Sequence, residues 1–138
     1  MYSRILAPVD LEMVDQLEKA LDVVANTAKR NNATVIYTGV VDAVPTPSAR
    51  TEGERMAERL KDFSADQAET RGIAASYHVE LRGDLHLTVG SDIIKAAKDN
   101  KCDLIVMASH VPGVKDHILS SNAGYVASHA PMSVYVVR

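Results

Sequence analysis

The chain has almost no cysteine. Cys102 is the single cysteine among 138 residues, so no internal disulfide can form, and no zinc-type spacing of cysteine and histidine surrounds it. Because disulfides persist in oxidising compartments, this composition fits a reducing cytoplasm. A reactive thiol needs a nearby base or an activating environment, and the sequence around Cys102 provides neither. We therefore expect a buried or edge thiol.

Long apolar runs and blocks of one charge are also missing. The opening residues, MYSRILAPVD, meet an acidic residue after a few apolar positions, which is too short for a signal peptide or a membrane span. The chain carries 15 Lys and Arg against 18 Asp and Glu, a formal net charge of −3, without a basic stripe. Affinity for nucleic-acid backbones needs such a stripe. We expect neither a nucleic-acid partner nor membrane insertion.

The common signatures of hydrolytic and metal sites are absent from the sequence. Ser120 and Ser121 lack the Gly-x-Ser-x-Gly elbow, and no paired carboxylates mark a glycosidase. No two histidines stand at metal-ligand spacing on one predicted helix face. The histidines are His78, His86, His110, His117 and His129. We expect no catalytic residue and no metal site built by the protein alone.

What the sequence does contain is the composition of one globular domain spanning residues 1–138. Hydrophobic residues make up 46% and charged residues 24%, close to the averages of folded proteins. A chain of this length buries one core of its own.

Apolar and β-branched segments alternate with segments of helical spacing. Five strands are predicted, at 5–9, 33–41, 74–81, 103–108 and 133–137. Helices are predicted at 14–30, at 51–70 with a capping box from Thr51 to Glu54, after a cap at Ser91, and from Ser121 or Asn122 to His129. We expect Asn31 and Asn32 to close the first helix and Gly72 to end the second. This alternation predicts a three-layer α/β/α sandwich around a mostly parallel sheet.

Ligands of open α/β sheets bind beyond the carboxyl ends of the strands, so the residues there are candidates. They are Asp10, Val41 with Asp42, Gly83 with Asp84, and Ser109 with His110. Asp10 has two interpretations: its carboxylate accepts hydrogen bonds from ribose hydroxyls or faces Mg²⁺, or it starts the turn into the first helix. Position alone does not separate them.

The segment after the fourth predicted strand leads to Ser120, Ser121 and Asn122 at a helix start. Free backbone N–H groups there favour an anion, which makes this a candidate phosphate site. The same residues are ordinary helix caps, and capping needs no ligand to explain them. The segment from 109 to 117 holds only Gly113, whereas backbones that wrap phosphates usually need more glycine.

Three segments together carry a family pattern. They read ILAPVD at 5–10, DLIVMASH at 103–110 and HAPMSVYVV at 129–137. With this spacing the chain resembles the universal stress protein family over essentially its whole length. The resemblance implies a five-stranded, Rossmann-like parallel sheet in the order 3-2-1-4-5. It also implies a homodimer in which the strand at 133–137 pairs antiparallel with its copy, which would cover an edge that otherwise invites aggregation.

The resemblance further implies that the chain binds ATP, and Mg²⁺ facing Asp10 could accompany it. Adenine and ribose would lie between the ends of the first, second and fourth strands, and the phosphates on a loop of pattern Gly-x-x-Gly, nine residues, then Gly-Ser or Gly-Thr. The implied residues are Pro8, Val9, Asp10, Val41, Met107, Ala108, Ser109, His110, Ser120, Ser121 and Asn122.

This chain departs from the loop pattern. Ala108 and Val111 stand at the first two glycines. Nine residues onward place Ser121 and Asn122 at the Gly-Ser pair, while a loop one residue shorter, which fits the resemblance better, places Ser120 and Ser121 there. A side chain on Ser120 would press on the phosphates or their backbone cradle.

Three functions follow as alternatives. The first is a stress-response regulator that binds ATP. The second is a nucleotide-free dimeric module of the same family, which acts through its dimer surface or the arm at 44–49. The third is a weak ATP hydrolase with His110 or Asp116 as the base.

Overall fold

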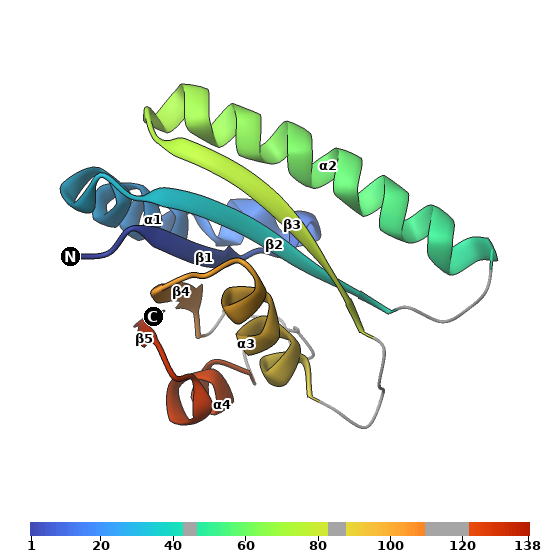
Figure 1. Ribbon diagram of the computed structural model, residues 1–138. Helices are drawn as coiled ribbons and strands as arrows, with labels where there is room; N and C mark the ends of the chain where they lie inside the picture. Colours follow the sequence, from blue (N-terminus) through green and yellow to red (C-terminus); the bar gives the residue numbers. More distant parts are fainter. Residues whose placement is uncertain (43–46, 83–87, 110–121) are drawn as a thin grey trace.

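The computed structural model describes residues 1–42, 47–82, 88–109 and 122–138, and Figure 1 shows how their elements are arranged. In chain order the elements are β1 (Arg4–Pro8), the 3-10 helix η1 (Leu11–Gln16), α1 (Glu18–Asn31), β2 (Thr34–Asp42), α2 (Pro47–Arg71), β3 (Ala74–Arg82), α3 (Val89–Asp99), β4 (Leu104–Ala108), α4 (Asn122–His129) and β5 (Ser133–Val137). The predicted alternation of strands and helices is confirmed.

The strands form one parallel sheet in the order β3-β2-β1-β4-β5, as the resemblance implies. Within this sheet, β1 and β4 carry short apolar runs, because strands covered on both faces need apolar residues at nearly every position. All five residues of β4 are buried, and Ile5 and Leu6 of β1 are fully enclosed. The core therefore lies on both sides of β1 and β4.

The helices form two layers, one on each face of the sheet. Arg71 at the end of α2 pairs with Glu18 and Asp22 of α1, so these two helices lie side by side on one face. Alternate residues of β3 point to opposite faces: Leu81 lies against α2, whereas Arg82 pairs with α3. α4 packs against α3 (Figure 1), which completes the second layer.

Two predicted helix starts are wrong. α3 is capped by Thr88, whose Oγ1 accepts from the backbone N–H of Ser91 at 3.1 Å; Ser91 itself lies inside the first turn. α2 begins at Pro47, so Thr51 lies within the helix and does not start a capping box. Proline suits a first helical position because the N–H it lacks would have no helical partner there.

The predicted first helix is divided into two. Asp10 caps η1, and the non-helical backbone of Met13 (φ −126°, ψ 21°) interrupts it before α1 begins at Glu18. The predicted ends of α1 and α2 are confirmed. Asn32 at φ 53° closes α1, and Gly72 at φ 63° follows α2; both adopt the left-handed conformation that asparagine and glycine tolerate.

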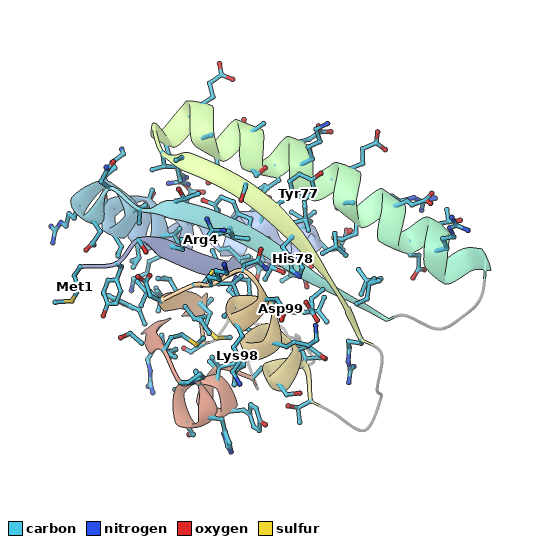
Figure 2. The ribbon with its side chains drawn as sticks, in the orientation of Figure 1. Met1, Arg4, Tyr77, His78, Lys98 and Asp99 are labelled. Atoms are coloured by element: carbon cyan, nitrogen blue, oxygen red, sulfur yellow. The ribbon has the colours of Figure 1, made fainter. Side chains whose placement is uncertain are left out.

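Charged residues fill part of the interface between β3 and α3. Glu80 is 3% exposed, and its carboxylate lies 3.0 Å from Lys95 Nζ and 2.8 Å from His78 Nε2. Asp92 is 4% exposed and lies 3.0 Å from Arg82 Nε. Figure 2 labels His78 on β3 and Asp99 on α3 in this region. Burial raises the pKa of the Asp92 carboxyl; Arg82 opposes this effect, and Glu80 adds to it.

We predict that Arg82→Met destabilises the fold by about 3 kcal/mol at neutral pH, because it leaves Asp92 buried without this ion-pair partner. The folded state already raises the pKa of Asp92, so folded protein holds this proton more tightly than unfolded chain does. The loss should therefore shrink as the pH falls through the folded-state pKa. Urea unfolding at neutral and mildly acidic pH measures both effects.

The double variant Arg82→Met/Asp92→Asn should recover most of the lost stability, because it removes the unpaired charge. Lys98→Met, at an exposed position of α3, is the matched control and should change the unfolding free energy little. Equal losses in Arg82→Met and Lys98→Met would contradict this account of the interface.

Candidate functional site

The carboxyl ends of β1 and β4 lie next to each other in the sheet, and the helices that follow them cover opposite faces. α1 follows β1 on one face, and α4 follows β4 on the other. Such a reversal of chain direction leaves a crevice between the two connections, which is where α/β sheets place their ligands. The candidate residues can be judged by their position relative to this crevice.

Asp10 lies at the end of β1, as the sequence predicts. Its Oδ1 accepts from the backbone N–H of Glu12 at 3.0 Å, and its carbonyl oxygen accepts from Met13 N, also at 3.0 Å. The capping interpretation is therefore confirmed. A carboxylate accepts several hydrogen bonds, and Asp10 is only partly buried, so capping does not prevent a ligand contact.

A small recess adjoins Asp10 at the carboxyl ends of β1 and β2. Its volume is about 70 Å³, against a few hundred for a typical small-molecule pocket. It is lined by Pro8, Val9, Asp10, Leu11, Thr38, Gly39, Val40, Met56 and Ile93. Met56 Sδ lies 3.1 Å from the position that a Cβ on Gly39 would take, so the thioether occupies the space beside β2. Methionine is flexible, and its movement would enlarge the recess.

Two other candidates have buried side chains. Val41 is 8% exposed and lines a recess of about 340 Å³ between β2 and α2. This recess shares Val40 and Met56 with the recess beside Asp10, which Val41 itself does not line. Met107 is 1% exposed within β4, so its side chain belongs to the core.

Ala108 and Ser109 line a larger cleft at the carboxyl ends of β4 and β5, between α1 and α4. Its volume is about 790 Å³. Small apolar residues form much of its lining, and the polar groups are contributed by Gln16, Lys19, Ser109 and Arg138. Lys19 Nζ donates to the carbonyl oxygen of Arg138 at 2.6 Å, which joins α1 to the residue after β5.

Sequence reasoning missed the part that α1 plays in this cleft. One signal was available: Lys19 is the second residue of α1, whereas the helix dipole favours acidic residues in a first turn. A cation at this position does not help the helix itself, which indicates that Lys19 is needed for a contact outside α1. Gln16 and Arg138 carry no comparable signal.

Asn122 is the first residue of α4, and its side chain contacts α3. Asn122 Oδ1 accepts from the backbone N–H of Gly90 at 3.1 Å. A Cβ on Gly90 would lie 2.6 Å from Tyr125 Cδ1, so the close approach of the two helices requires glycine. This packing fixes the start of α4. His110, Ser120 and Ser121 lie outside the described residues, as do Gly83, Asp84, Val111 and Asp116.

Cys102 is a buried thiol, as the sequence predicts. It is 6% exposed, and burial raises its pKa to about 11, which keeps it protonated near neutral pH. Across residues 1–42, 47–82, 88–109 and 122–138, no group of three or more His, Cys, Asp or Glu could hold a metal ion. Within those same ranges no helix has the length and apolar character to cross a bilayer.

Comparison with known proteins identifies the family. The model of the universal stress protein family matches residues 1–138. A universal stress protein from Methanothermobacter thermautotrophicus is 30% identical over 149 residues, covering 100% of this chain and 97% of its own.

Two solved structures share the fold. A universal stress protein in complex with cAMP has a TM-score of 0.74 at 15% identity, covering 99% of this chain and 97% of its own. The protein from Archaeoglobus fulgidus in complex with dAMP has a TM-score of 0.71 at 18% identity, covering 99% and 98%. With the family match over residues 1–138 and this sheet order, the chain belongs to the universal stress protein family.

Proposed function

We propose that this protein is a regulator that binds an adenine nucleotide and acts as a homodimer. The observation that carries the nucleotide part is the edge of the sheet at the ends of β1 and β4, where Asp10 borders the small recess and Ser109 borders the cleft. Relatives of the same fold have been solved in complex with cAMP and dAMP, which are both adenine nucleotides. The shared fold supports the same ligand class here.

The residues suggest how such a ligand would be held. Asp10 would accept hydrogen bonds from the ribose hydroxyls, since its carboxylate lies at the mouth of a central strand. The base would enter the recess beside β2, for which Met56 would have to change its rotamer. In its alternative role Asp10 would face Mg²⁺, which usually binds nucleotides through the phosphates and one or two carboxylates.

Replacing Asp10 with Ala should weaken ATP binding about ten-fold, roughly the contribution of one hydrogen bond to a charged group. Asp10→Asn should weaken binding as well, while its amide oxygen can still cap η1. Isothermal titration calorimetry measures the affinities, and circular dichroism checks the fold. Asp15→Ala, at an exposed position of η1, is the matched control. Unchanged affinity in both Asp10 variants would remove Asp10 from the site.

The homodimer is proposed to form through β5, which is one edge of the sheet. Tyr135 lies at the middle of this strand and is 50% exposed. In an antiparallel pair related by a two-fold axis, the central residue of the strand lies near its own copy. Pairing would bury part of Tyr135. It would also give hydrogen-bond partners to the backbone N–H and C=O groups of the edge strand, which otherwise invite aggregation.

Tyr135→Asp should weaken the homodimer about five-fold, because two like charges would then face each other near the axis, as in an unfavourable cross-strand pair. Sedimentation velocity over a range of protein concentrations measures the equilibrium. Tyr77→Asp provides the control, since Tyr77 is 39% exposed on the opposite edge strand, β3 (Figure 2). Equal weakening by both variants, or by neither, would argue against the β5 interface.

A nucleotide-free interaction module is the second candidate function. Two observations favour it: the recess beside Asp10 has a volume of only about 70 Å³, and Ala108 stands where the family loop has its first glycine. One experiment distinguishes the two functions: natively purified protein is denatured, and the small molecules it releases are identified by mass spectrometry. A stoichiometric adenine nucleotide supports the regulator. An empty protein that also ignores added ATP supports the interaction module.

A further inference from the structure

Met56 separates two recesses at the carboxyl end of β2. The smaller recess, beside Asp10, has a volume of about 70 Å³, and the larger one, between β2 and α2, has about 340 Å³. Met56 and Val40 line both of them. If the Met56 side chain moved away, the two would join into one pocket of roughly 400 Å³, which is within the range of small-molecule sites. One side chain therefore limits the space beside Asp10.

The position of Met56 depends on the glycine opposite it. Met56 Sδ lies 3.1 Å from the place that a Cβ on Gly39 would take, so the thioether rests close to the backbone of β2. Met56 is only partly buried and packs at the border of the core. Methionine is unbranched and changes rotamer easily. Met56 can therefore leave this position while the core stays packed.

An ion pair joins α2 to η1 beside the same two recesses. Arg59 Nη1 lies 2.8 Å from Glu12 Oε1. Arg59 follows Met56 by three residues, so their side chains share one face of α2, and Arg59 lines the larger recess. Glu12 follows Leu11, which lines the smaller recess. The ion pair therefore connects the walls of the two recesses that Met56 separates.

This ion pair is weak enough to open and is linked to the candidate ligand contact. The side chains of Arg59 and Glu12 are 43% and 74% exposed, and exposed ion pairs contribute little to stability. Salt weakens them further by screening. The backbone N–H of Glu12 donates to Asp10 Oδ1 at 3.0 Å, so one hydrogen bond joins the residue that holds α2 to the carboxylate expected to contact the ligand.

We propose that Met56 and the ion pair of Arg59 with Glu12 form a gate that holds the recess beside Asp10 closed, and that the gate opens more readily as the ionic strength rises. Its regulatory meaning rests on the proposed nucleotide function. A nucleoside would bind only protein whose gate is open, so the closed fraction lowers its apparent affinity. The inference adds control of ligand entry to that function and assigns this control to α2.

The first test needs no ligand. Hydrogen peroxide oxidises an accessible methionine to its sulfoxide, and mass spectrometry of peptides follows Met56 separately from Met132, the internal reference. Glu12→Gln and Arg59→Gln should each speed the oxidation of Met56 about three-fold, since an exposed ion pair accounts for at most about five-fold. Met132 should react as in wild type. Glu54→Gln is the matched control, because it breaks another exposed ion pair of α2.

The second test uses adenosine, an uncharged probe, in NMR titrations of the whole protein. The salt concentrations are about 0.01 M and about 1 M, between which the screening length falls from roughly 30 Å to roughly 3 Å. Wild type should bind adenosine about three-fold more tightly at the higher salt, since the ion pair is then screened. Glu12→Gln lacks the ion pair and measures any general effect of salt. Met56→Ala should bind tightly at both concentrations.

The outcomes separate the gate from the proposed function. If Met56 is oxidised at one rate in wild type, Glu12→Gln and Arg59→Gln, the gate is wrong whether or not adenosine binds. If both variants speed oxidation but neither adenosine nor ATP binds to any of the proteins, the gate is correct and the adenine-nucleotide function is wrong. If adenosine binds to wild type and Glu12→Gln with the same salt dependence, control of ligand entry is wrong and the nucleotide function stands. Circular dichroism checks that each variant is folded.

Discussion

The pairing of β1 with β4 holds the two halves of the sheet together. β3, β2 and β1 form one half, β4 and β5 form the other, and this single junction joins them. Asp103, just before β4, reinforces it: its carboxylate accepts from Ser3 N, Ser3 Oγ and Arg4 N at 2.9 to 3.2 Å. Partial burial opposes ionisation of Asp103, but these hydrogen bonds prevail and its pKa lies below the usual value. The same junction brings Asp10 and Ser109 to one edge, so the candidate site depends on the contact that unites the core.

The strands and their order could be predicted because burial on both faces leaves a strong signal in sequence. The apolar run of β4 is an example. Helix starts were harder, because a cap depends on which of several suitable residues has the right backbone geometry. Thr88 and Ser91 both have hydroxyls, and only the extended backbone of Thr88 (φ −77°, ψ 155°) suits the cap. The interface of β3 with α3 was not anticipated, since Glu80 and Asp92 find their partners across elements.

The candidate site, too, could be predicted from the sequence only in part. Asp10, Ala108 and Ser109 could be predicted because the carboxyl ends of parallel strands share one edge. Val41 follows the same rule, yet it lines the recess between β2 and α2 and not the one beside Asp10. Lys19 and Arg138 are separated by most of the chain, and only the folded structure brings them together. Sequence reasoning therefore found the strand ends and missed the charged side of the cleft.

The contact between Gly90 and Asn122 gives α3 a second role. Ion pairs with β3 fix the position of α3 along the sheet, because sliding by one turn would separate buried charges. α3 in turn holds the first residue of α4 through the Gly90 N–H. The wall of the cleft that α4 forms is thus aligned from the far edge of the sheet, three strands away from β4. Substitutions in β3 would therefore alter the shape of the cleft, although β3 does not line it. Residues of β3, α3 and α4 should change together among relatives.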